Sequence, residues 1–146
     1  ALALGAKVDI VTIPGYLPML HDEGLMGVFR QNAEALVGRD AFVAHPEDRV
    51  KGGSTDMGDL SQIMPAIHPY TGGASGMGHG VDYTIVDYEQ AVVRPAKAMA
   101  MAVIDLLADG AAQGREVVAK ARPPMTKDQY LSLQSSRLTE ESYVGE

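Results

Sequence analysis

The pattern of apolar and polar residues along the first 40 positions predicts a strand followed by a helix. The opening ALAL fits the last turn of a helix ending at Gly5, so the chain is expected to begin inside a fold. Residues 7–13, KVDIVTI, are rich in β-branched side chains and predict a strand, which PGYLP ends. Helical spacing then predicts an amphipathic helix from an N-cap at Asp22 to a stop at Gly38. Its apolar face holds Leu25, Met26, Val28, Phe29, Ala33, Leu36 and Val37.

The strongest periodic pattern lies between residues 88 and 108 and predicts a second amphipathic helix. Asp87 and Gln90 resemble a capping box at its start, and Asp109–Gly110 marks its end. Pro95 either kinks this helix or belongs to its first turn. From about residue 124 the chain turns polar, and we expect a less ordered tail with room for one short helix.

The central block, residues 52–80, is the least regular and contains most of the residue types that form sites. Ser54 or Thr55 is expected to cap a short helix that runs to about Ile63. The segment PAIHPY, residues 65–70, is predicted as a brief buried strand between prolines, and GGASGMGHG, residues 72–80, as the loop after it. Alternating strands and helices predict the α/β class, in which ligands bind at loops that follow strands.

Composition narrows the classes of partner and metal ligand. The 146 residues, 46% hydrophobic, fit a globular domain, and a net charge of −7 with scattered Lys and Arg gives no basic surface for nucleic acid or a membrane. No apolar stretch approaches the roughly 18 residues of a membrane span. The chain has no cysteine, which suits a reducing cytoplasm and leaves His, Asp and Glu as ligands for any transition metal.

Four histidines, His21, His45, His68 and His79, are the first candidates for a site. An exposed or satisfied core position is the ordinary interpretation for the first three. Glycines surround His79 and let a ligand approach the backbone closely. Since one histidine without a nearby second ligand is a weak metal signal, spacing alone leaves a metal ligand and a plain flexible turn both open.

The carboxylates of Asp56 and Asp59 are the other candidates, close to the start of the short central helix. Both are placed to cap that helix. Asp56 is also placed to orient an imidazole or to contact a substrate, and the sequence does not choose between these interpretations. The glycine-rich loop lacks the lysine of a phosphate loop, and there is no G-x-S-x-G nucleophile motif.

Four segments in this order resemble the C-terminal third of the co-catalytic zinc amidohydrolases, the metallopeptidase family of aminoacylase and glutamate carboxypeptidase. The resemblance is specifically to the branch of aminobenzoyl-glutamate hydrolase and Xaa-Arg dipeptidase, and it covers residues 1 to about 110. The segments are GYLPMLHDEGL (15–25), GSTDMGDLSQIMPAIHPY (53–70), GMGHGVDY (76–83) and AVVRPAKAMAMAVIDLLAD (91–109).

The resemblance implies a division of the chain between two domains. Residues 1–20 would be the last helix and strand of a ferredoxin-like lid, which often mediates dimerisation, and residues 21–146 the C-terminal part of a zinc-peptidase-like catalytic domain with a mixed sheet. The partners implied are a second copy of the enzyme or its missing N-terminal part, and a small amide or dipeptide substrate.

The resemblance also assigns the site residues. His79 would be the last ligand of a site for two divalent metal ions, Zn or Mn, with Asp56 in support and with His68, Gly76 and Gly78 at the substrate. Gly80 departs from the family, which often has Thr or Ser after the histidine. The resemblance places the family's His-x-Asp pair, and the Glu-Glu pair that contains its general base, in segments N-terminal to the ones that this chain matches.

The function implied is metal-assisted hydrolysis of the amide bond of an N-acyl amino acid or a dipeptide, to which this chain contributes one ligand. The chain alone is expected to be inactive and to bind little or no metal. The alternative is a stand-alone, non-enzymatic α/β binding or assembly module derived from the same fold.

Overall fold

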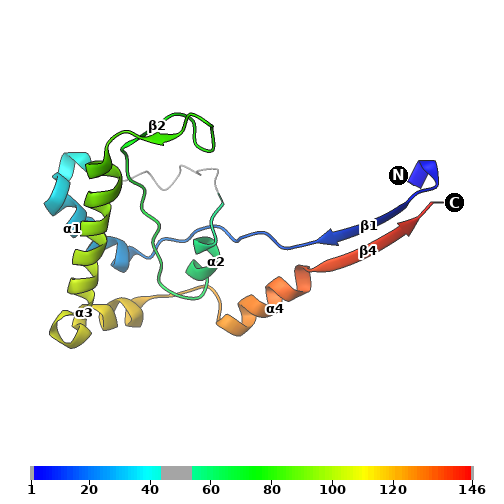
Figure 1. Ribbon diagram of the computed structural model, residues 1–146. Helices are drawn as coiled ribbons and strands as arrows, with labels where there is room; N and C mark the ends of the chain where they lie inside the picture. Colours follow the sequence, from blue (N-terminus) through cyan, green and yellow to red (C-terminus); the bar gives the residue numbers. More distant parts are fainter. Residues whose placement is uncertain (1, 44–53, 146) are drawn as a thin grey trace.

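The computed structural model describes residues 2–43 and 54–145. It combines helices with short antiparallel strands, in keeping with the predicted α/β class (Figure 1). The elements in chain order are η1 (Leu2–Leu4), β1 (Lys7–Thr12), α1 (Glu23–Val37), η2 (Arg39–Ala41), α2 (Met57–Ser61), β2 (Ala74–Ser75), β3 (Thr84–Ile85), η3 (Glu89–Val93), α3 (Arg94–Lys120), α4 (Lys127–Arg137) and β4 (Thr139–Val144).

The elements form two parts, which we call the body and the arm (Figure 1). In the body, α1 packs against α3, with α2 and the β2–β3 hairpin beside them. In the arm, α4 leads into β4, which pairs antiparallel with β1 from Lys7 opposite Val144 to Thr12 opposite Thr139. The two ends of the chain therefore meet at the tip of the arm, where Gly145 N donates to Ala6 O at 3.3 Å.

The α1 helix forms as its sequence predicts. The Asp22 carboxylate accepts a hydrogen bond from Leu25 N at 2.8 Å, which confirms the N-cap, and Gly38 ends the helix with a positive φ of 83°. Val28 and Phe29 are buried against α3, whose alanines Ala98 and Ala102 allow the two helices a close approach.

The second predicted helix is present but differs at both ends. It begins as the single π-helical turn η3, and Pro95 lies in the first turn of α3, where its missing N–H removes no hydrogen bond. The predicted break at Asp109–Gly110 is confirmed, because the backbone leaves helical geometry from Ala108 to Ala111. A further helical stretch then continues to Lys120.

Two expectations for the central and C-terminal segments are wrong. Residues 65–70 form no strand, because Pro65 and Pro69 have no N–H to donate. The expected short helix of the tail is present as α4, but the expectation of lower order beyond it is wrong, because residues 139–144 form β4. The order of the tail comes from a capping box between Thr126 and Gln129 and from the pairing of β4 with a strand at the other end of the chain.

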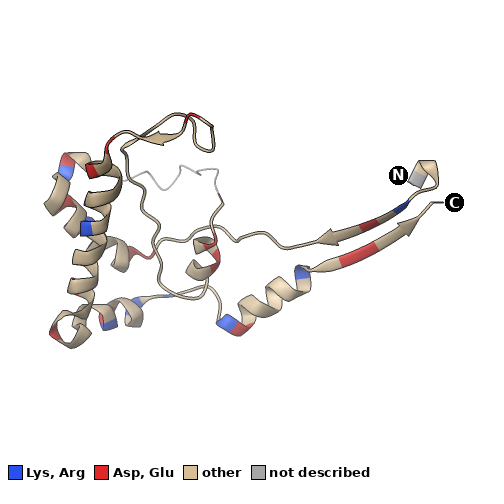
Figure 2. Ribbon diagram, in the orientation of Figure 1, with Lys and Arg blue, Asp and Glu red and all other residues tan. Residues whose placement is uncertain are grey.

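Much of the apolar surface of the protein is uncovered. The chain exposes 10799 Å² to solvent. A compact chain of this mass would expose roughly 7,200 Å². Figure 2 shows the Lys and Arg of the described residues spread over body and arm among the acidic residues. Within the described residues, no helix combines the length and the apolar character needed to cross a membrane.

Candidate functional site

The glycine-rich segment forms a β-hairpin whose turn carries His79 (Figure 1). Strands β2 and β3 pair antiparallel, and within the turn Gly80 N donates to Met77 O at 2.7 Å. His79 has a left-handed backbone, with φ of 66°, and is exposed to solvent. Its imidazole is therefore free of the core and accessible to a ligand.

Two glycines fix this hairpin in place. Gly73 has φ of 96°, and a Cβ on it would lie 2.6 Å from Asp87 O and 2.8 Å from Ala91 N. Gly76 has φ of 91°, and a Cβ there would overlap Asp82 O. Gly76 is thus required by the turn itself, whereas a Cβ on Gly78 would meet open space. Of the two glycines predicted at the substrate, only Gly76 has a structural role of this kind.

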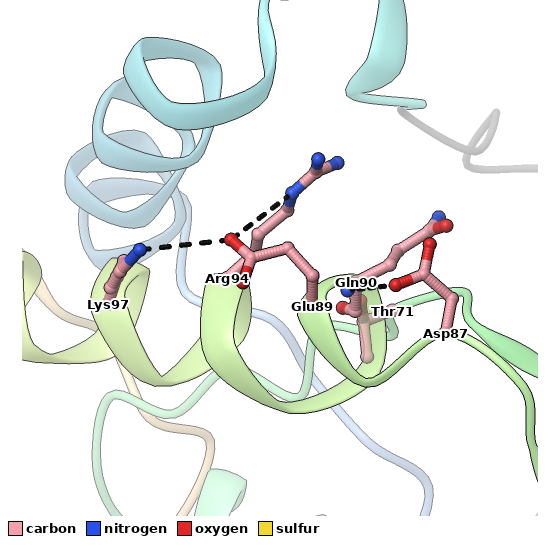
Figure 3. Close-up of polar contacts among 6 residues, drawn as sticks. All are labelled: Thr71, Asp87, Glu89, Gln90, Arg94 and Lys97. Carbon is pink, nitrogen blue, oxygen red and sulfur yellow. Dashed lines mark hydrogen bonds and ion pairs between the residues drawn. The ribbon is translucent and has the colours of Figure 1, made fainter.

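The hairpin is attached to the start of η3 by several hydrogen bonds. Val86 N and Asp87 N both donate to Gly73 O, at 2.9 and 3.0 Å. The Thr71 hydroxyl donates to Gln90 O at 2.8 Å, and Gln90 N donates to the Asp87 carboxylate at 2.9 Å, as the capping pattern predicts (Figure 3). These bonds fix the base of the hairpin that carries His79 to the start of η3, so the hairpin is more than a flexible connection.

A group of exposed charged side chains follows along η3 and the start of α3. The Glu89 carboxylate lies 3.9 Å from Arg94 Nε and 3.8 Å from Lys97 Nζ (Figure 3). Because all three side chains are solvent-exposed, these ion pairs contribute little to stability.

The predicted supporting residue Asp56 lies at the start of α2 and is exposed. Its carboxylate makes no cap hydrogen bond to α2. The Thr55 hydroxyl contacts it at 3.4 Å and also accepts from Met57 N at 3.3 Å, so Thr55 takes the capping position predicted for Ser54 or Thr55. The carboxylate of Asp56 is left available for another partner.

The polar residues that follow in α2 bind backbone rather than a site. The Asp59 carboxylate accepts from Leu17 N at 2.8 Å, and the Ser61 hydroxyl accepts from Leu20 N at 3.0 Å. These contacts join GSTDMGDLSQ to GYLPML, two of the segments that carry the family resemblance. Sequence reasoning predicted capping for Asp59 and missed this role, since no local pattern indicates a partner 42 residues away.

His68 and His21 lie next to one another. His68 N donates to His21 Nδ1 at 3.3 Å, and the His68 ring makes an edge contact with Tyr70 at 5.2 Å between centroids. Burial and the neighbouring His68 lower the pKa of His21. His68 Nδ1 is buried without a hydrogen-bond partner, which contradicts the ordinary interpretation of a satisfied core histidine.

The structure does not gather the predicted site residues into a metal centre. Among residues 2–43 and 54–145, no three His, Asp or Glu side chains lie close enough together to hold a metal ion. His79 is on the hairpin, Asp56 precedes α2 and His68 contacts His21. His45 lies outside the described residues. The described residues therefore do not form a metal site by themselves.

Comparison with known proteins finds two Xaa-Arg dipeptidases. In an alignment of 117 positions that covers 73% of this chain, the sequence is 32% identical to the Mus musculus protein and 31% identical to the Homo sapiens protein. The match covers 26% of each, so the chain spans about a quarter of the length of these curated relatives. No family model and no solved structure matches the chain. The similarity supports a relationship with the metallopeptidase family and with dipeptidase-like hydrolases.

Proposed function

We propose that this chain is the C-terminal part of a metal-dependent amidohydrolase that hydrolyses the amide bond of an N-acyl amino acid or a dipeptide. The observation that carries the proposal is the exposed imidazole of His79 on a hairpin whose base is fixed by hydrogen bonds. The similarity to proteins named Xaa-Arg dipeptidase supports an amide substrate and the corresponding branch of the family. Residues 1–20 are assigned to a lid domain and residues 21–146 to the catalytic domain.

In this proposal His79 is one ligand of a site for two divalent ions, Zn or Mn, whose other ligands come from outside the described residues. Such ions lower the pKa of a bound water and polarise the amide carbonyl. Asp56 supports the site through its carboxylate, which makes no cap hydrogen bond to α2. Gly76, Gly78 and His68 contact the substrate. The turn's glycines allow a substrate to come close to the backbone.

The uncovered surface supports a role as part of a larger protein. The exposed area is about 1.5 times that of a compact chain of 15.5 kDa. Apolar side chains such as Ile104 and Leu107 are more than half exposed on α3. We propose that other parts of the enzyme, or a second copy of it, cover these side chains.

The test is the variant His79→Asn in the complete protein that contains this chain. Asparagine tolerates the left-handed backbone at this position and lacks the imidazole. We expect zinc or manganese content to fall and dipeptide hydrolysis to drop by more than about 100-fold, since loss of a residue that only orients a ligand already reduces activity 10- to 100-fold.

The matched control is Met77→Ala, a change at another exposed residue of the same turn. It should leave metal content and hydrolysis close to the unchanged protein. Full activity of His79→Asn would contradict the proposal. So would stoichiometric metal and turnover in the 146-residue chain by itself. Absence of both metal and hydrolysis in the complete protein would favour the non-enzymatic binding or assembly module.

A further inference from the structure

Two chain segments join the arm to the body, and we call them the neck: residues 13–22, which lead from β1 to α1, and residues 121–126, which lead from α3 to α4 (Figure 1). Both neck segments are held by α2 and the residues after it. We call residues 57–68 the clamp.

The clamp binds the first neck segment through side chains. Asp59 and Ser61 accept hydrogen bonds from Leu17 N and Leu20 N. Gly58 is buried in the same contact, because a Cβ at this position would overlap Leu17 O. The helix α2 therefore lies directly against the backbone of the neck.

Gln62 connects the clamp to both neck segments. Its side-chain amide donates to Pro18 O at 2.7 Å, and its backbone carbonyl accepts from Met125 N at 3.2 Å. Gln62 is only 7% exposed. Because buried amides that lose their partners are costly, these bonds favour one position of the neck.

The other end of the clamp meets the neck at His21. Asp22 N donates to Ala66 O at 3.0 Å, and His68 N donates to His21 Nδ1 at 3.3 Å. A nitrogen that accepts cannot carry a proton, so neutral His21 holds its hydrogen on Nε2. A second proton on Nδ1 would place two N–H donors face to face and remove the hydrogen bond.

Among the described residues, no carboxylate forms an ion pair with His21. The Asp22 carboxylate is bound to Leu25 N, and Glu116 is paired with Lys120 at 2.5 Å. Other charged or titratable groups that line the surrounding pockets or contact His21 are His68, Glu23 and Arg122.

We propose that residues 57–68 are a pH-sensitive clamp, which fixes the arm on the body while His21 is neutral and loosens the neck when His21 is protonated. This inference rests on the hydrogen bonds among the clamp, the neck and His21. Neither His79 nor a metal takes part, and His68, which the proposed function places at the substrate, takes part only through its backbone N–H.

Amide hydrogen exchange on the full chain tests the clamp directly, since its bonds protect identifiable backbone N–H groups. Gln62→Ala keeps the backbone carbonyl that accepts from Met125 N but loses the side-chain bond to Pro18 O, so the neck should open more readily. We expect the protection of Met125 N to fall about tenfold, the factor that corresponds to the loss of one hydrogen bond. Ser61→Ala should do the same at Leu20 N while leaving Leu25 N, which Asp22 protects, unchanged. Unaltered protection in both variants would overturn the proposal.

A distance measurement tests the effect of pH on the arm. The chain has no cysteine, so Met99→Cys on α3 and Glu140→Cys on β4 provide unique positions for two spin labels. We expect a narrow distribution of label distances at about pH 7.5 and a broader one at about pH 5.5, a range that spans the usual titration of histidine.

The variant His21→Gln is the control for titration, because glutamine keeps a hydrogen-bond acceptor and carries no charge. Its label distances should remain narrow at both values of pH. If His21→Gln broadens as the unchanged protein does, another group is responsible and the proposal fails. It fails equally if the unchanged protein gives the same distribution at both values.

Discussion

Three described residues other than glycine adopt a left-handed backbone: His79, Asp109 and Ala111. Aspartate and histidine are found in this conformation more often than most residues. Ala111 has no side chain that could compensate by hydrogen bonding, so the break in α3 is strained at this residue. The strain is local, and it can be removed by a single substitution.

We predict that Ala111→Gly stabilises the protein. Glycine removes the steric conflict of a Cβ at φ of 62°, but its larger conformational entropy in the unfolded chain offsets part of this effect. We expect the free energy of unfolding to rise by about 0.5–1 kcal/mol. Urea unfolding measures this change. The matched control Ala112→Gly, one residue later in helical geometry, should instead lower stability by about 0.5–1 kcal/mol.

His21 makes stability depend on pH. Its pKa in the folded protein is lowered from the ordinary value of 6.5, first by burial and then by His68, so the unfolded chain binds the proton more readily. Neutral His21 therefore stabilises the folded protein. This contribution is complete at pH values above the ordinary pKa and is lost as pH falls through the pKa of the folded state. Urea unfolding at decreasing pH should show the loss, and the loss should be smaller in His21→Gln.

At the scale of the element, the sequence predicted those helices whose signals are local. Asp22 and Gly38 mark the two ends of α1, and the break in α3 occurs at the predicted Asp109–Gly110. The missed elements depend on distant partners. Nothing in TEESYV indicates a strand until β1, at the other end of the chain, pairs with it.

The candidate site shows the same difference between features with local signals and features that depend on distant partners. The glycines around His79 predicted a turn, and the structure confirms one. The clamp contacts of Asp59, Ser61 and Gln62 were missed, because polar residues at a helix start fit capping equally well and the bonds they form span more than 40 residues. The roles of His79 and Asp56 in a metal site stay predictions.

We predict that Thr126→Ala destabilises α4. The Thr126 hydroxyl accepts from Gln129 N, and the Gln129 side chain accepts from Thr126 N at 2.8 Å. Loss of such a cap costs about 1 kcal/mol. Hydrogen exchange should show faster exchange at Gln129 N, whereas Ser135→Ala in the same helix should leave Gln129 N unchanged.

At the scale of the whole molecule, the uncovered apolar face of α3 predicts self-association. Met99, Ile104 and Leu107 are 57%, 64% and 65% exposed. Because such surfaces lower their free energy when covered, we expect light scattering from the 146-residue chain to show a mass that rises with concentration.

The double variant Ile104→Lys and Leu107→Lys should shift the chain toward the monomer, because two charged side chains oppose burial of this face. The control, Leu131→Lys on the exposed surface of α4, should leave association unchanged. A monodisperse monomer in the unchanged chain would contradict the prediction.

The pairing of β1 with β4 sets the order in which the protein folds. Thr12 and Thr139 are 127 positions apart (139 − 12), so their encounter in an unfolded chain requires closure of nearly the whole sequence. Once α1 has packed on α3 and the neck is held, short segments bring the two strands together. We therefore expect the arm to form last and to open first, and its refolding rate to report on the neck.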